Sequence, residues 1–152
     1  YPFAVDSDWF SGKAEIASFE PEELFGTKLA ALLQRRKNRD LFDLGHGLDQ
    51  LRLDAAKVVA SLDHYLALEG APITRAVAEQ RMLEKLTRNL TEDIEPLLPT
   101  GLHYGEDQAI QAFERVWAEL VARLPGESWK STGKAVADLR KVRFPSLLSG
   151  LA

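Results

Sequence analysis

The chain has no cysteine, no long apolar run and no charged-then-apolar leader segment. Without cysteine it can form no disulfide, so the fold must depend on a packed core. A membrane-spanning helix needs about 18 or more consecutive apolar residues, and no stretch approaches that length. We therefore expect a cytoplasmic protein with no membrane partner, and its 152 residues suffice for one domain with one hydrophobic core.

Net positive charge is also lacking, since the formal net charge is −4. Non-specific binding to nucleic acid grows with the number of phosphates that Lys and Arg neutralise. An acidic chain is therefore not expected to coat nucleic acid over its whole surface. Any RNA contact must be local, and the candidates are the basic run 35–39 and a second run at Arg140, Lys141 and Arg143.

The common catalytic clusters are absent too. No second His, Cys or Ser stands at the spacing of a nucleophilic triad or a zinc site. His46 lies between Gly45 and Gly47, which weaken a helix by about 1 kcal/mol each relative to Ala. These glycines either let another backbone or a ligand come close or simply mark a loose helix end. His103 and Tyr104 stand in a short expected loop, where packing or surface roles compete with stacking on a base.

The most informative stretch is 20–51, where charges crowd beside apolar faces. Its first half predicts a helix that starts near the proline after residue 20. The apolar arc of this helix consists of Leu24, Phe25, Leu29, Leu32 and Leu33. On the same helical wheel Lys28, Arg35 and Arg39 line one border of the arc, while Arg36 falls inside it. We therefore predict that Arg36 is partly buried and paired, because an uncompensated buried charge is costly.

Two carboxylates follow directly in the second half of the stretch. Asp40 and Asp43 lie on the border of a second apolar arc, which consists of Leu41, Leu44, Leu48 and Leu51. Cations and carboxylates should therefore converge where the two helices meet. One interpretation is a structural salt-bridge network with a solvated basic rim. The other is a phosphate site, in which Lys28 gives a point charge, Arg35 or Arg39 a planar fork, and the carboxylates fix the cations.

The run FEPEELFGTKLAALLQRRKNRDLFDL, residues 19–44, resembles the C-terminal motif region of the AbiEii/AbiGii-type nucleotidyltransferase toxins. That motif has a glutamate-rich helix start, a Lys, an Arg-x-Lys-x-Arg-Asp run and an Asp-Leu. Here these elements are Glu22 and Glu23, Lys28, the run 35–40, and Asp43 followed by Leu. The resemblance implies a toxin of toxin–antitoxin and abortive-infection systems. It would transfer a nucleotide from a nucleoside triphosphate to an acceptor, tRNA 3′ ends being the acceptor proposed for some members.

The resemblance also implies roles for individual residues. Lys28 and Asp40 would be catalytic: Lys28 grips the triphosphate, and Asp40 positions that lysine or assists activation of the acceptor. The residues that bind substrate and hold the site together would be Arg35, Arg36, Arg39 and Asp43. A cognate antitoxin would be the protein partner.

Magnesium is the cofactor that the resemblance implies, but its usual ligands are missing. Such enzymes carry, toward the N-terminus, a Gly-Ser turn followed by an Asp-x-Asp or Asp-x-Glu pair, and no such Gly-Ser turn occurs here. Asp6-Ser7-Asp8 is an Asp-x-Asp pair, but without that turn we assign it to a turn or the surface. Because the chain starts at Tyr1 without Met, we expect the C-terminal part of a longer protein, with most magnesium ligands elsewhere, and no activity from this chain alone.

The expected fold is mainly α, a helical bundle-like domain with a short N-terminal β-hairpin or edge strands, as the C-terminal part of an α/β nucleotidyltransferase. Residues 1–19 hold β-formers interrupted by Ser11-Gly12, a turn between two strands that would belong to the nucleotidyltransferase sheet. Residues 20–152 form the helical domain. Its later helices are predicted from Asp54 to about Glu69, from Thr74 to about Asn89, from Glu106 to Leu124, and through Val136 and Leu139.

A non-catalytic helical interaction module is the alternative function. Trp117, Trp129 or the apolar tail around Phe144 and Leu148 would then recognise a protein partner. The tail either docks back on the domain or forms an exposed contact patch.

Overall fold

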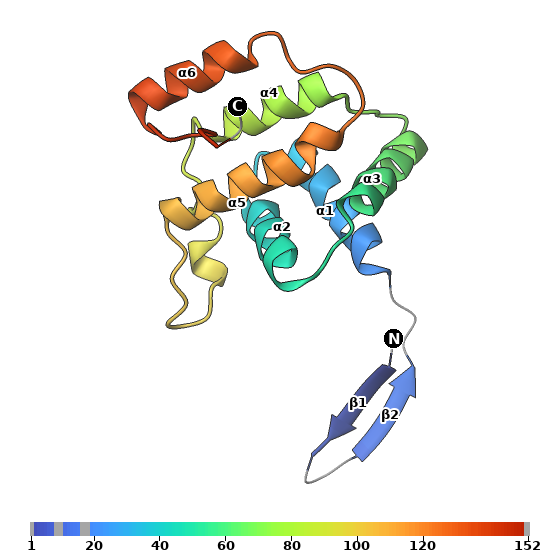
Figure 1. Cartoon of the computed structure of the whole chain (residues 1–152). Helices are drawn as coiled ribbons and strands as arrows, with labels where there is room; N and C mark the ends of the chain where they lie inside the picture. The colour runs from blue at the N-terminus through green and yellow to red at the C-terminus, as the bar shows by residue number, and fades with distance from the viewer. Residues whose placement is uncertain (1, 8–10, 16–18, 151–152) are drawn as a thin grey trace.

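The computed structural model describes residues 2–7, 11–15 and 19–150. These residues form a mainly helical protein with a two-stranded antiparallel sheet near the N-terminus. The helices make up the body, and the hairpin lies apart from it, beyond the start of the first helix, α1 (Pro21–Gln34) (Figure 1). The predicted fold class, a helical domain with a small N-terminal hairpin, is confirmed.

The hairpin consists of β1 (Pro2–Asp6) and β2 (Ser11–Glu15). Ser11 pairs with Asp6 at the start of β2, so the prediction of a turn at Ser11-Gly12 is wrong. Backbone pairing with β1 outweighs the weak local turn preference of Ser and Gly. Asp8 lies outside the described residues, and with it the full Asp-x-Asp pair.

α1 packs most extensively against α3 (Ala55–Glu69) and next against α2 (Arg39–Gln50). The predicted apolar arc of α1 is buried except for Leu24, which is 44% exposed. Its buried members are Phe25, Leu29, Leu32 and Leu33. Each such side chain contributes about 1.5–3 kcal/mol on burial, so these contacts fix the angle at which α2 and α3 meet α1.

Two glycines of α2 allow its neighbours to come close. A Cβ at Gly45 would lie 2.6 Å from the Cβ of Ala112 in α5 (Glu106–Glu119), and a Cβ at Gly47 would lie 2.3 Å from the ring of Phe25. Both spacings are far below van der Waals contact. The interpretation of close approach by another backbone is confirmed at Gly45, where Ala112 Cα would lie 3.3 Å away, whereas Gly47 gives room to the side chain of Phe25. α2 continues past both glycines to Gln50, so they do not mark a loose helix end.

Local capping signals place the next two helices. Asp54 accepts hydrogen bonds from the backbone N–H groups of Ala56 and Lys57, and Gly70 ends α3 with a φ of 68°. Thr74 caps α4 (Arg75–Lys85), which ends four residues before the predicted Asn89. The sequence thus predicts the starts of these helices better than the end of α4, as expected when caps are local and helix ends depend on packing.

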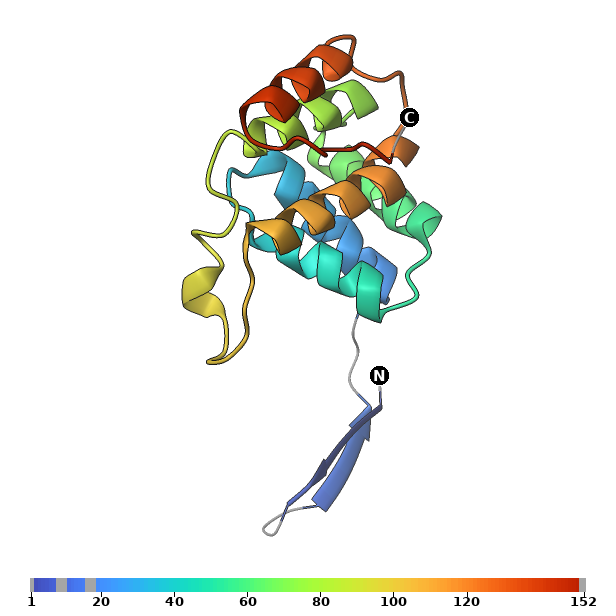
Figure 2. The same cartoon turned by 60° about the vertical axis from the view of Figure 1, so that its left-hand side comes forward.

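The C-terminal third folds back onto the body. The short helices η1 (Glu95–Leu97) and η2 (Val121–Arg123) flank α5, and α6 (Thr132–Val142) lies beside α4 (Figures 1 and 2). Trp117 of α5 and the tail residues Phe144 and Leu148 are buried. The tail therefore docks on the domain and is not an exposed patch. Among the described residues no helix is long and apolar enough to cross a membrane.

Candidate functional site

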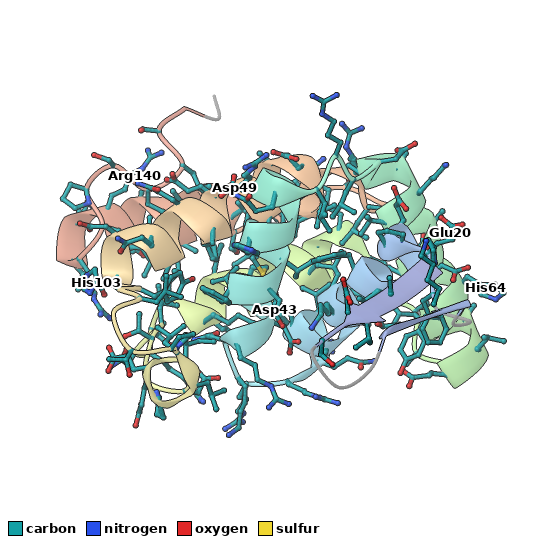
Figure 3. The ribbon with its side chains drawn as sticks, turned by 90° about the horizontal axis from the view of Figure 1, so that it is seen from below. Glu20, Asp43, Asp49, His64, His103 and Arg140 are labelled. Carbon is teal, nitrogen blue, oxygen red and sulfur yellow. The ribbon has the colours of Figure 1, made fainter. Side chains whose placement is uncertain are left out.

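The predicted convergence of charges occurs where α1 meets α2. Lys28 Nζ of α1 lies 2.7 Å from Asp43 Oδ2 of α2, and the two side chains are 28% and 41% exposed. Figure 3 shows Asp43 at the boundary between these helices, with His103 at the far edge of the molecule. The pair is therefore open to solvent and accessible to a ligand.

The connection between α1 and α2 is fixed by a distant carboxylate. Asp93 Oδ2 accepts hydrogen bonds from the backbone N–H groups of Asn38 at 2.8 Å and Arg39 at 3.2 Å. These are two of the N–H groups that the start of a helix leaves without an intrahelical partner. Asp93 thus caps α2 and holds Asp40 in its first turn.

Asp40 is buried, with only 6% of its surface exposed. Its Oδ2 atom has no hydrogen-bond partner among the described residues. Burial raises the pKa of the Asp40 carboxyl above its ordinary value, and the nearby charges of Lys28 and Arg39 only partly oppose this. The carboxylate faces cations without a direct hydrogen bond to them, which is an unusual state for a buried acid.

Arg35, Arg36 and Arg39 are all exposed. The prediction that Arg36 is buried and paired is therefore wrong. α1 ends at Gln34, and Arg35 has extended backbone angles, so the helical wheel no longer applies at Arg36. Within the described part of the chain none of these three arginines forms an ion pair, which leaves their guanidinium groups available to an anionic ligand.

Sequence reasoning missed Lys85, which completes the junction from α4. Its Nζ donates to the carbonyl oxygens of Arg35 at 2.7 Å and Lys37 at 3.4 Å. Lys85 is only 6% exposed, and burial lowers its pKa to about 8. A signal was present, because Lys85 falls on the apolar face of α4 beside Ala78 and Met82, where a cation requires a partner.

The second basic run does not form an open site. Arg140 Nε donates to the carbonyl oxygen of Leu147 at 2.7 Å, and Arg143 pairs with Glu106. Tyr104 is buried edge-on against the ring of Phe42, with centroids 4.9 Å apart, so the packing interpretation holds for this residue. Two cations of the second run are thus engaged within the domain, although Lys141 and Arg143 are exposed, whereas Arg35, Arg36 and Arg39 are exposed and form no ion pair among the described residues.

The residues at this junction do not fit a magnesium site. Asp43 is engaged by Lys28, and Asp40 is buried one turn away. In the described ranges no group of three or more His, Asp or Glu side chains lies close enough together to hold a metal ion. Mg²⁺ prefers several oxygen ligands in octahedral geometry, which this pair of carboxylates does not offer.

A match to a family model gives the class of this helical protein, which is a nucleotidyltransferase-like toxin. The model describes the nucleotidyl transferase AbiEii toxin of type IV toxin–antitoxin systems and matches residues 1–119. The match spans well over half of the chain and includes Lys28, Asp40 and Asp43. The chain therefore belongs to the AbiEii family, and the resemblance seen in residues 19–44 is confirmed. No curated protein and no solved structure matches the chain.

Proposed function

We propose that this protein transfers a nucleotide from a nucleoside triphosphate to the hydroxyl group of an acceptor, with tRNA as the acceptor. The family supports the reaction class. The open junction of α1 and α2 supports the site, because it gathers one lysine, three exposed arginines and two carboxylates. We also propose that the reaction takes place in the cytoplasm and needs residues of the full-length enzyme beyond this chain, which alone is inactive.

The observation that carries the proposal is the state of Asp40. A buried carboxylate with an oxygen that lacks a donor costs stability, so its presence calls for another explanation. A carboxyl whose pKa is raised is a better proton acceptor than an ordinary aspartate. Asp40 therefore has the properties of a group that accepts a proton or a hydrogen bond from a substrate.

In the proposed reaction, the acceptor oxygen bonds to the α-phosphorus, the bond from that phosphorus to the bridging oxygen breaks, and pyrophosphate leaves. Asp40 accepts the proton of the acceptor hydroxyl or positions Lys28. Lys28 neutralises the charge that develops on the triphosphate, which is a large part of catalysis in phosphoryl transfer. Asp43, at 2.7 Å from Lys28, holds that lysine in place in the free protein and releases it to the nucleotide.

The exposed arginines would bind the rest of the triphosphate. Arg35 and Arg39 lie close enough to Asp40 for their charges to oppose in part the rise in its pKa that burial causes. Their guanidinium groups match phosphate oxygens with two parallel hydrogen bonds. Arg36 is exposed beside them and takes part as a solvent-facing charge.

Magnesium remains an expectation for the full-length enzyme. Because the carboxylates of this junction do not fit the ion, we propose that its ligands lie mostly outside this chain. When bound, the ion would supply charge neutralisation at the phosphates. The roles of Lys28, Asp40 and the arginines do not depend on its position.

The test is the variant Lys28→Ala. Binding of a nucleoside triphosphate to this chain is measured by calorimetry, and transfer of a labelled nucleotide to tRNA is measured in the full-length enzyme. We expect transfer to fall by at least about 100-fold, because a cation that acts on the transition state is lost. The free energy of unfolding should change by less than about 1 kcal/mol, since the Lys28 pair is partly exposed.

The matched control is Lys57→Ala, which removes an exposed lysine at the start of α3. Transfer at the wild-type rate in Lys28→Ala, or an equal loss in the control, would contradict the assignment of Lys28.

One observation favours the alternative of a binding module. An apolar groove of about 580 Å³ lies between α4 and α6, lined by Leu83, Trp129, Leu139 and Val142. Val142 is 84% exposed, and α6 lies outside the residues that the family model matches. A protein partner such as an antitoxin could occupy this groove without catalysis. If full-length Lys28→Ala and Asp40→Asn transfer nucleotides like the wild type, or if the wild type transfers none, this interpretation replaces the enzymatic one.

A further inference from the structure

A second cationic surface adjoins the candidate site. A cavity of about 370 Å³ lies between the end of α1 and α4. Its charged lining residues are Arg35, Arg36, Arg81, Lys85, Arg88 and Glu84. The cavity thus holds five of the 19 basic residues but one of the 23 acidic ones, in a chain whose net charge is −4. These positive charges repel one another, and an anionic ligand would reduce the repulsion.

Part of this charge is structural. Arg81 Nη1 donates to the carbonyl oxygen of Leu33 at 3.2 Å, and Lys85 Nζ donates to that of Arg35. These contacts satisfy carbonyl groups at the C-terminal end of α1, where cations are favourable. Arg36 and Arg88 make no such contact with their side chains among the described residues and are both exposed. Stabilisation of the end of α1 therefore explains the presence of Arg81 and Lys85, but it does not explain Arg36 and Arg88.

The position of the cavity argues against a small anion as its ligand. Sites for single phosphates commonly use backbone N–H groups at the N-terminus of a helix. This cavity lies at the C-terminal ends of α1 and α4, whose dipoles are unfavourable to an anion. Its positive potential comes only from long side chains spread over two segments of the chain. Spread-out cations suit a polyanion better than a single phosphate.

The cavity lies at a distance from Lys28 that one RNA strand could span. Lys28 and Arg35 are seven residues apart, which is about 10 Å along a helix, since each residue rises about 1.5 Å. A strand whose reacting end lies at Lys28 would pass its backbone along the end of α1. Arg36 and Arg88 would then meet the phosphates of that backbone.

We propose that the cavity lined by Arg36, Arg81, Lys85 and Arg88 binds the phosphodiester backbone of the RNA acceptor, while Arg35 at its edge serves the triphosphate. This inference rests on the proposed nucleotidyl transfer at Lys28. Arg36 and Arg88 make the contacts that change most on binding, while Arg81 and Lys85 anchor the end of α1 and add to the positive field.

The test measures the affinity of this chain for a fluorescent single-stranded RNA by anisotropy at several salt concentrations. The test variant is Arg36→Gln/Arg88→Gln. The control is Lys57→Gln/Lys134→Gln, which changes the net charge equally at exposed lysines on α3 and α6. We expect the test variant to bind about tenfold more weakly at about 100 mM salt, and its salt slope to fall by about 1.4, which is about 0.7 for each lost contact with a phosphate of a single strand. The control should stay within about twofold of the wild type.

Wild-type chain that does not bind RNA at low salt would overturn the proposal, as would equal losses in both variants, which would show only an effect of overall charge. Inorganic phosphate provides the third arm. If it displaces RNA at ionic strengths where chloride does not, the cavity takes single phosphates and the backbone assignment is wrong. Arg36→Lys/Arg88→Lys should keep most of the affinity, because point charges suffice for backbone contacts.

The same assay separates this proposal from nucleotidyl transfer itself. Lys28→Ala should bind RNA like the wild type even though it fails in transfer. RNA binding at this cavity without transfer would leave the cavity assignment standing and remove the proposed function. If transfer occurs but replacing Arg36 and Arg88 does not change RNA affinity, the proposed function stands and the assignment of the cavity is wrong.

Discussion

Glu79 and Asp40 are both buried, but they differ in their hydrogen bonds and in the direction in which their pKa is shifted. Glu79 of α4 is 1% exposed, and its Oε1 accepts from Arg75 Nε at 2.8 Å. Its Oε2 accepts from Ser128 Oγ, Trp129 N and Thr132 Oγ1 at 2.6–2.9 Å. Burial works to raise the pKa of Glu79, but hydrogen bonds led by those of Thr132 and Ser128 outweigh it and hold the pKa below its ordinary value.

Asp40 at the α1–α2 junction is buried to a similar extent but lacks such donors. Its Oδ2 has no partner among the described residues, and burial raises its pKa. Glu79 connects α4 to the start of α6 and stabilises the fold, whereas Asp40 costs stability where it stands. The difference supports the proposal that the junction, and not the α4–α6 contact, serves a function other than stability.

The largest expected effect is the loss of stability when Glu79, the acid whose oxygens are all hydrogen-bonded, is replaced. Glu79→Ala leaves four donors without their acceptor, three of them on the segment 128–132. We expect the free energy of unfolding to fall by about 3 kcal/mol in denaturant titration. Because the pKa of Glu79 is lowered in the folded protein, this contribution is present above its unfolded pKa and is lost as pH falls through the folded pKa. The difference between wild type and variant should therefore shrink in acid.

Glu84→Ala is the matched control on the same helix. Glu84 is exposed, and its change should alter stability by no more than about 0.5 kcal/mol. Equal losses in the two variants would show that the hydrogen bonds of Glu79 contribute nothing specific.

The contrast between these acids also shows what sequence could predict. The caps at Asp54 and Thr74 were predictable because each satisfies backbone groups within three residues of itself. The burial of Arg36 was predicted wrongly because a helical wheel assumes that the helix continues. α1 instead ends at Gln34, and its end is held by Lys85, 50 residues further along the chain.

The candidate site was predictable in part for the same reason. Lys28, Asp40 and Asp43 lie within 16 consecutive residues, so their order and spacing suggested convergence, and the family resemblance added the proposed roles. The cationic cavity was not predicted, because Arg81 and Arg88 come from α4 and the turn after it. Only the packing of α4 against the end of α1 brings those charges to Arg35.

A smaller change in stability is expected when Asp40, the acid with an oxygen that lacks a donor, is replaced. A raised pKa in the folded state means that Asp40 contributes stability below its unfolded pKa, and that this is lost as pH rises through the folded pKa. At neutral pH the ionised group therefore costs stability. We expect Asp40→Asn to leave the free energy of unfolding unchanged or to raise it by up to about 1 kcal/mol at neutral pH, while transfer by the full-length enzyme is lost.

Asp43→Asn serves as the control for Asp40. It breaks the partly exposed Lys28 pair and should cost less than about 1 kcal/mol at neutral pH. A loss of stability in Asp40→Asn that matches that of Glu79→Ala would show that Asp40 is a structural acid like Glu79, and the contrast between the two regions would fail.

The smallest expected effect is the pH dependence that Lys85 gives the junction. Burial lowers its pKa to about 8 from the ordinary 10.5, so between these values the unfolded chain holds a proton that the folded protein has released. Stability should therefore rise by about 1 kcal/mol between about pH 8 and pH 9, below the range in which the tyrosines of the unfolded chain ionise. Lys85→Met loses two hydrogen bonds to the end of α1 and should be less stable at every pH, but it should not show this rise. Denaturant titrations of both proteins across this range measure the slope directly, and parallel slopes would mean that Lys85 is as well solvated in the folded protein as in the unfolded chain.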